Sequence, residues 1–356
     1  MLLNMRVIII NIFLLLLLVF LFSCSDEKND NIVSISVDIS NAQLFSKSRD
    51  NVQILSLDTA TIALQGEVYS IIFLENIIAV RTSNRLSLFD NHCIYIRDLG
   101  RLGRAGNEFI TLSSVFFEND TFELFDVEGQ KILRFDTTGI FIGSKSFDKN
   151  NEFSVSRINS FFDSYIALNR YRGELVKTPT LVLFDKDLYQ KNTTGKNLIS
   201  GFTLHNVFSY YSNEMLFWNI FDYNIYSIEK DFILKPKYFI NFGKYSIPKN
   251  IYRMNNAEKI MEYLLNNEKV VVSSIQYVIE NESYLNFTFS LDSTYYLVIF
   301  NKKDGKTKVY ELKLSEHFYF YPFMTIHEDN YVFCGVDTSN PLSNVEIIFI
   351  KQNIIQ

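Results

Sequence analysis

The chain repeats one hydrophobic pattern, in which two apolar or aromatic strands flank a short polar pair. In the first copy, Val68–Leu74 and Ile77–Arg81 lie on either side of Glu75 and Asn76. Asn, Asp and neighbouring polar residues suit tight turns, because they tolerate positive φ and bond their own backbone. The pairs are Glu75–Asn76, Asn119–Asp120, Asp163–Ser164, Asn213–Glu214, Asn281–Glu282 and Asp329–Asn330. The pattern therefore predicts a series of β-hairpins.

The spacing of these hairpins predicts the architecture. The first residues of successive pairs are 44, 44, 50, 68 and 48 residues apart, close to the propeller-blade repeat of about 40 to 50 residues. A second, weaker hairpin follows each first one; in the second unit, Lys131–Asp136 turns through Thr137–Gly139 into Ile140–Phe147. Four strands per repeat make a blade. We expect an all-β fold, a six-bladed β-propeller of four-stranded antiparallel blades.

The chain ends predict how the ring closes. The sixth unit stops after Val345–Lys351 without a fourth strand, and a strand at Val52–Asp58 is left over before the first unit. Pairing these two segments would remove two exposed sheet edges. We therefore expect closure between the N-terminal and C-terminal strands.

One helix is predicted within the longest repeat spacing. Ala257, Ile260, Met261, Leu264 and Leu265 follow helical periodicity, and Asn255 with Glu258 resembles a capping box. The insertion covers residues 250–268 approximately. It is either a lid or partner helix, or an element packed on the ring.

The N-terminal segment reads as a lipoprotein signal. Arg6 precedes the apolar run Val7–Leu21, and Leu21–Cys24 has the form of a lipobox whose cysteine is lipidated. An uncleaved membrane-spanning helix is the alternative. Ser25–Asp30 is polar and acidic, and such a segment cannot bury apolar surface. The predicted division is a signal peptide at 1–23, lipidation at Cys24, a polar tether at 24–50 and the propeller at 51–356.

Composition narrows the possible functions. The net charge of −6 argues against nucleic acid as a partner, because nucleic-acid-binding proteins are usually basic. Besides Cys24, only Cys93 and Cys334 remain. Two cysteines form no disulfide framework; they are either buried free thiols or a bridge, which requires Cα atoms within about 7 Å.

Sequence motifs indicate neither a metal site nor a cofactor. The histidines are isolated and lack metal-ligand spacing, and the chain contains no G-x-S-x-G and no phosphate-binding P-loop. Trp218, Phe221 and Tyr223 either stack on a sugar ring or pack between blades. The histidines are His92, His205, His317 and His327.

Arginines provide the candidate binding site. In a four-stranded blade, the loops between the second and third strands lie on the same face as the connectors between blades. Seven of the 11 arginines after Cys24 are assigned to that face. The planar guanidinium suits bidentate recognition of carboxylate, sulfate or phosphate; the alternative is that these arginines support the connectors or are simply solvated. They are Arg81, Arg85, Arg101, Arg104, Arg170, Arg172 and Arg253.

Two stretches resemble a known family. Gly103–Phe109, G-R-A-G-N-E-F, resembles the G-R/K-G-P-G-E-F/Y element of Bacteroidetes six-bladed β-propeller lipoproteins, from which Ala105 and Asn107 depart. Ile225–Lys244 resembles the same family's "IY-x-I … P-x-Y-x-I-x-F-G-K" stretch. The acidic residues after Cys24 resemble the export signal of Bacteroidetes surface lipoproteins. The resemblance implies a TolB-like or NHL-like propeller at the surface or in the periplasm, with no known catalytic residue.

These observations favour a lipid-anchored binding or scaffold protein of the cell envelope, at the outer membrane. We expect an anionic glycan, a peptide or an envelope protein as its partner. The alternatives are a propeller enzyme of the lyase or lactonase type and a structural subunit of an envelope complex.

Overall fold

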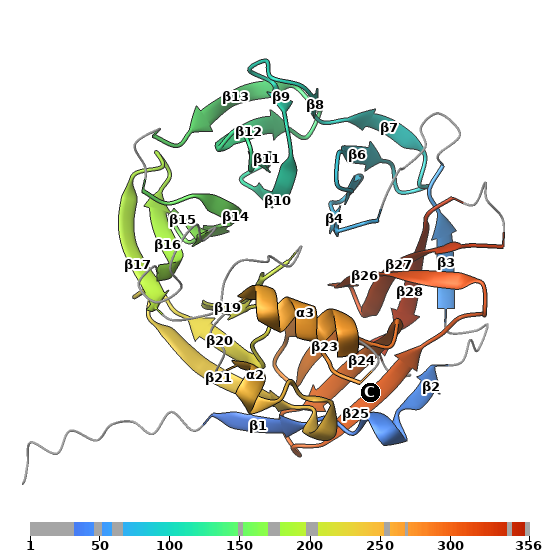
Figure 1. Ribbon diagram of the computed structural model, residues 1–356. Coiled ribbons are helices and arrows are strands. Elements are labelled where there is room, and N and C mark those ends of the chain that lie inside the picture. Colours follow the sequence, from blue (N-terminus) through green and yellow to red (C-terminus); the bar gives the residue numbers. More distant parts are fainter. Residues whose placement is uncertain are drawn as a thin grey trace, which may run out of the picture.

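Six β-sheets surround a central axis, and each is one blade of a propeller (Figure 1). The computed structural model describes residues 32–45, 52–58, 67–148, 152–169, 179–196, 206–252, 257–267, 270–339 and 344–352. Within each blade the strands that follow one another in sequence pair antiparallel. The predicted fold is confirmed.

The blades follow the chain in order. Blade 1 contains β4 (Ser70–Phe73), β5 (Ile78–Arg81), β6 (Leu86–Phe89) and β7 (Tyr95–Asp98). Blade 2 contains β10 (Leu112–Glu118), β11 (Thr121–Asp126), β12 (Lys131–Asp136) and β13 (Phe141–Ser146), and blade 3 contains β14 (Val155–Phe161), β15 (Ser164–Asn169), β16 (Pro179–Asp185) and β17 (Gln190–Lys196). A short parallel pair, β8 (Arg101–Leu102) and β9 (Glu108–Phe109), connects blades 1 and 2.

The second half of the ring has the same plan. Blade 4 contains β18 (Phe208–Tyr211), β19 (Glu214–Trp218), β20 (Asn224–Ile228) and β21 (Leu234–Asn241). Blade 5 contains β22 (Gln276–Glu280), β23 (Tyr284–Leu291), β24 (Thr294–Asn301) and β25 (Thr307–Leu312). Blade 6 contains β26 (Phe318–His327), β27 (Asn330–Asp337) and β28 (Glu346–Lys351), and its fourth strand is β3 (Val52–Ser56).

The pairing of β3 with β28 confirms the predicted use of the leftover strand. The two strands are antiparallel, with Val52 opposite Ile350 and Ser56 opposite Glu346. The last blade is thus completed by a segment that precedes the first blade in the sequence. This pairing links residues almost 300 positions apart, and it joins an early strand and the last strand in one sheet.

The expectation of a polar tether at 24–50 is wrong for its described part. β1 (Val33–Ser36) pairs parallel with the outer edge of β21, and β2 (Gln43–Phe45) pairs parallel with β25. A 3-10 turn, η1 (Ile39–Asn41), connects them. Ile35 is only 1% exposed, and Val37 and Phe45 are also buried. Alternating apolar residues allow this segment to cover the edges of two blades, which would otherwise be exposed.

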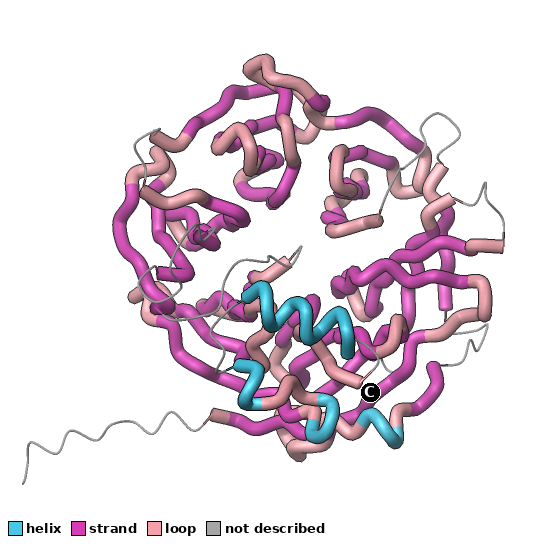
Figure 2. Tube along the Cα trace, viewed as in Figure 1, coloured by secondary structure: helices cyan, strands magenta, loops and turns pink. Residues whose placement is uncertain are grey.

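The predicted helix is confirmed as α3 (Ala257–Asn267), preceded by η3 (Gly243–Tyr245) and α2 (Lys249–Tyr252). Figure 2 shows the helices gathered on the side of the ring that blades 4 and 5 occupy. Leu264 is buried in the core shared by these blades, whereas Leu265 is 67% exposed. The predicted apolar face is therefore narrower than the sequence suggested. Asn255, the proposed cap, lies outside the described residues.

The core lies mainly between blades. Trp218, Phe221 and Tyr223 are buried and pack as core residues, and none of them is an exposed surface aromatic. Cys93 and Cys334 are both buried free thiols. Burial raises the pKa of each thiol, which keeps it protonated.

A repeated hydrogen bond joins the second strands of neighbouring blades. The Tyr165 hydroxyl donates to Glu123 across blades 2 and 3, at 2.8 Å. The Tyr331 hydroxyl donates to Asn286 across blades 5 and 6, also at 2.8 Å. Both tyrosines occupy the second position of their strand, and both acceptors the third. The repeat therefore extends to individual contacts between blades.

Candidate functional site

The first strands that Figure 1 labels, β4, β10, β14 and β26, lie closest to the ring axis in their blades. β10 contacts β14 and β4, β22 contacts β18 and β26, and β26 contacts β4. These first strands all enter the ring from the face that carries the connectors between blades. A residue near the start of a first strand is therefore placed at the same end of the central channel as the end of a second strand.

A cavity of about 120 Å³ lies at that end of the channel. Four blades contribute to it. The lining residues are Tyr69, which precedes β4, Ser70 in β4, Ser114 in β10, Arg157 in β14 and Asn206, which precedes β18. Arg81, the last residue of β5, completes its wall. Among the described residues that line this cavity, two are arginines and none is acidic.

Arg81 is a buried residue that carries a positive charge. The residue is 4% exposed, and its Nε has no hydrogen-bond partner among the described residues. Its guanidinium lies over the Tyr69 ring, 5.4 Å from the centroid. Burial lowers the pKa of Arg81 to about 9, with repulsion from Arg157 as a second cause. The group is thus still charged at neutral pH, and burial of such a charge is costly unless a ligand or a partner compensates.

Arg157 supplies a second guanidinium to the same cavity. One of its terminal nitrogens donates to the Ser156 carbonyl at 2.9 Å. Burial raises the pKa of Tyr69 and the charge of Glu67 raises it further, whereas Arg81 and Arg157 lower it. Glu67 is not among the residues that line the cavity. The arrangement suits an anionic group that accepts hydrogen bonds from two guanidiniums.

The other predicted arginines have different roles. Arg85 forms an ion pair with Asp98 at 3.7 Å. Arg101 is 76% exposed, and its Nε donates to Glu108 at 2.6 Å. Glu108 also accepts a hydrogen bond from the Ala105 N–H at 2.8 Å. The bonds from Ala105 and Arg101 lower the pKa of the Glu108 carboxyl, and the bond from Ala105 has the larger effect. The alternative reading, support of the connector, therefore holds for Arg101.

The remaining predicted site residues lie either at the surface or outside the described residues. Arg104 is exposed and does not line the channel cavity. Cys24, Arg170, Arg172 and Arg253 lie outside the described residues, as do the signal peptide and the first part of the proposed tether. The structure therefore brings one predicted arginine, Arg81, together with Arg157, which sequence reasoning missed.

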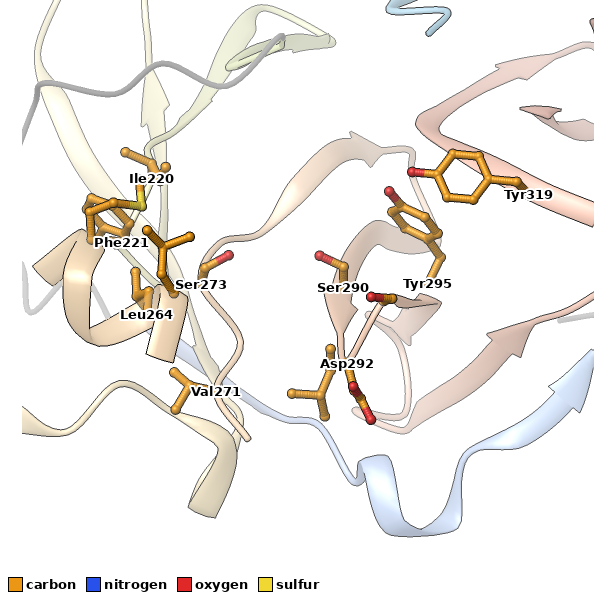
Figure 3. Close-up of a pocket in the computed structure, with 13 residues that line it drawn as sticks. Ile220, Phe221, Leu264, Val271, Ser273, Ser290, Asp292, Tyr295 and Tyr319 are labelled. Atoms are coloured by element: carbon orange, nitrogen blue, oxygen red, sulfur yellow. The ribbon is translucent and has the colours of Figure 1, made fainter. Parts of the chain in front are cut away.

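A second cavity lies beneath α3, on the same face of the ring, with a volume of about 330 Å³ (Figure 3). Ile220, Phe221 and Leu264 form an apolar wall, while Ser290, Tyr295 and Tyr319 present hydroxyl groups. Asp292 and Ser293 form the adjoining turn with φ of 50° and 60°. No basic residue is among its described lining residues, so its chemistry differs from that of the channel cavity.

Within the described ranges, no three His, Cys, Asp or Glu residues are grouped so that they could hold a metal ion. His327 stacks on Phe73 with 4.2 Å between ring centroids, and His205 is outside the described ranges. No helix of the described part is long and apolar enough to cross a membrane.

Fold and site together define a six-bladed β-propeller with an arginine-lined cavity at one end of its central channel. The chain belongs to the family of the domain of unknown function DUF4934, whose model matches residues 30–350. The match covers all six blades and the two added strands.

Solved structures support the fold. A "putative exported protein" from Bacteroides fragilis NCTC 9343 has a TM-score of 0.72 and 18% identity, covering 90% of this chain and 99% of that protein. A DUF4221 family member from Bacteroides vulgatus ATCC 8482 has a TM-score of 0.53 and 10% identity, covering 85% of this chain and 98% of the other. No curated protein matches this chain.

Proposed function

We propose that this protein is a lipid-anchored binding protein of the cell envelope, which holds an anionic group of a glycan or peptide between Arg81 and Arg157. The observation that carries the proposal is the buried Arg81 guanidinium: its Nε has no hydrogen-bond partner among the described residues, and Arg81 lines a cavity that has no described acidic lining residue. A carboxylate placed there would satisfy a group whose burial is otherwise unfavourable.

The anchor part of the proposal rests on the sequence. The lipobox at Leu21–Cys24 would place the mature protein on a membrane through a diacylglycerol and an N-acyl chain. Two or more acyl chains give stable attachment, where a single chain is marginal. The outer membrane and the Bacteroidetes origin follow from the family resemblance and stay predictions.

Calorimetric titration of the mature chain carrying Cys24→Ala tests the binding site. Oligogalacturonate and a short acidic peptide serve as anionic probes, and a neutral oligosaccharide of equal length is the control. We expect binding of an anionic probe that weakens with salt, since charge recognition is screened. We expect no binding of the neutral probe.

Two substitutions locate the site. Arg81→Lys keeps the charge but loses the planar fork, and should weaken binding about tenfold or more, the value of a charge-assisted hydrogen bond. Arg85→Gln is the matched control, because Arg85 belongs to the same blade but pairs with Asp98. Equal affinity of Arg81→Lys and the unsubstituted protein for every anionic probe would contradict the proposal.

A further inference from the structure

The central channel has another cavity at its opposite end, distinct from the cavity beneath α3. Its volume is about 640 Å³, and it shares Val115 and Asn159 with the arginine-lined cavity. The two cavities are therefore adjacent along the same first strands. One lies near the starts of β4, β10 and β14, and the other near their ends.

The chemistry of the wall changes along these strands. On β4, Ser70 lines the arginine end and Phe73 the opposite end. On β10, Ser114 lines the arginine end and Phe117 the opposite end. The third blade contributes Arg157 at the arginine end and Phe162 at the opposite end. Phe73, Phe117 and Phe162 line the cavity and are half-buried; each ring also contacts another ring, those of His327, Phe122 and Phe161 respectively. The channel is thus cationic and polar at one end and aromatic at the other.

The one acidic residue that lines the aromatic cavity, within the described part of the chain, has its charge compensated. Glu118 accepts hydrogen bonds from Lys186 at 2.6 Å and from Ser160 at 2.7 Å. Lys186 in turn lies over the Tyr165 ring, 4.1 Å from the centroid. This carboxylate is therefore part of the contact between blades 2 and 3, and it leaves the cavity wall predominantly apolar.

We infer that the ligand of the channel is an amphipathic carboxylate, with its charged group between Arg81 and Arg157 and an unbroken apolar chain extending toward Phe73, Phe117 and Phe162. The inference rests on the anion site of the proposed function, and it assigns a fatty carboxylate to that site in place of a glycan or peptide. Ser70 and Phe73 are three residues apart, about 10 Å of extended strand, and a decanoate tail is long enough to cover that distance. A polyuronate carries hydroxyl groups and a carboxylate on every sugar, and these groups would lose hydrogen bonds to water against a predominantly apolar wall.

A series of carboxylates tests the inference with the mature Cys24→Ala chain. Acetate, hexanoate and decanoate, each below its micelle concentration, are titrated by calorimetry, with decanol and oligogalacturonate as comparisons. Burial of each further methylene should tighten binding about two- to fourfold. We expect decanoate to bind most tightly, and decanol to bind far more weakly than decanoate.

Variants separate the two ends of the site. Arg81→Gln should weaken decanoate and hexanoate alike. Phe73→Ser should weaken decanoate several-fold while leaving acetate unchanged. Tyr210→Ala provides a second test of the aromatic end, since Tyr210 lines that cavity and is 45% exposed; the variant also removes the hydrogen bond that the Tyr210 hydroxyl donates to the Ser160 carbonyl. Tyr189→Ala, on an exposed residue outside both cavities, is the control.

The possible failures are distinct. An affinity that is flat from acetate to decanoate but sensitive to Arg81→Gln overturns the inference and leaves the proposed function standing. Tighter, Arg81-dependent binding of oligogalacturonate than of decanoate does the same. Binding of decanol equal to that of decanoate, or no binding of any carboxylate, overturns the proposed function itself.

Discussion

Arg81 is a charged residue that forms no ion pair among the described residues, and its burial affects the free energy of unfolding. Replacing a buried charge by an apolar side chain of similar volume is often neutral or stabilising, by about 1 to 4 kcal/mol. We expect Arg81→Met to leave the melting temperature of the ligand-free protein unchanged or raised, while binding of the anionic probe is lost. Stability and binding change in opposite directions at residues that serve a ligand.

Arg134→Met is the matched control for this prediction. Arg134 lies 3.3 Å from Glu123, whose side chain is 7% exposed, so its loss leaves a carboxylate buried with the Tyr165 hydroxyl as its remaining partner. We expect this variant to melt at a lower temperature. If Arg81→Met destabilises the ligand-free protein as much as Arg134→Met does, Arg81 is structural.

The lipid anchor is tested at Cys24. Cys24→Ala removes the thiol that receives the diacylglycerol, so the protein should leave the membrane fraction. Incorporation of labelled palmitate is the measurement. Equal incorporation by the Cys24→Ala and unsubstituted proteins would show that the anchor is elsewhere.

Arginine pairing shows where residue-level prediction from sequence ends. The hairpin repeat placed Arg81 on the correct face, because strand order determines which turn lies at which end. The choice of partner depends on three-dimensional proximity, as in Arg85 with Asp98 and Arg101 with Glu108. Arg157 was missed because it lies within a first strand, and only loops were assigned to the face; its only signal was a charged residue inside the strand Val155–Phe161.

At the scale of elements, β1 should stabilise the propeller through its buried residues. Ile35→Ala removes a side chain that is 1% exposed, and we expect a loss of about 2 to 4 kcal/mol in the free energy of unfolding. Ser34→Ala, on the exposed face of the same strand, should cost within about 0.5 kcal/mol. Urea unfolding measures both, and an equal midpoint for the two variants would mean that β1 contributes nothing.

The alternation of Val33, Ile35 and Val37 with polar residues is a strand signal that the sequence already contains. The acidic residues around Ser25–Asp30 led to the opposite prediction for the whole segment. β1 has no local partner, since it pairs with β21 about 200 residues later. The hairpin pattern predicts pairings between strands that are neighbours in sequence. It cannot assign a strand that pairs in parallel with another strand about 200 residues later.

The repeated tyrosine bond between blades gives another prediction at this scale. Tyr331→Phe removes the hydroxyl that donates to Asn286, whose side chain is fully buried. Loss of one partner of a buried hydrogen bond costs about 1 to 3 kcal/mol. Tyr165→Phe should cost less, since Glu123 keeps Arg134. Thermal unfolding of the two variants is the measurement, and a larger loss for Tyr165→Phe would contradict the ranking.

At the scale of the molecule, the sequence predicted the fold well and the site poorly. The number of blades and the use of the Val52–Asp58 strand follow from repeat spacing and from the cost of exposed sheet edges. The channel cavities depend on side chains from four blades, which no local pattern relates. The net charge of −6 conceals a positive site, because two guanidiniums meet in a cavity whose described lining carries no acid.

The central claim is that an anion binds between Arg81 and Arg157 in the channel, and the Arg81 Nε–H reports on it directly. A titration of the ¹⁵N-labelled mature protein with decanoate, followed in the arginine Nε region of the NMR spectrum, is the measurement, with the Arg81 signal assigned by its absence in Arg81→Lys. We predict that the Arg81 signal shifts progressively to saturation while the Arg134 signal stays in place. Saturable binding that leaves the Arg81 signal unmoved would contradict the claim.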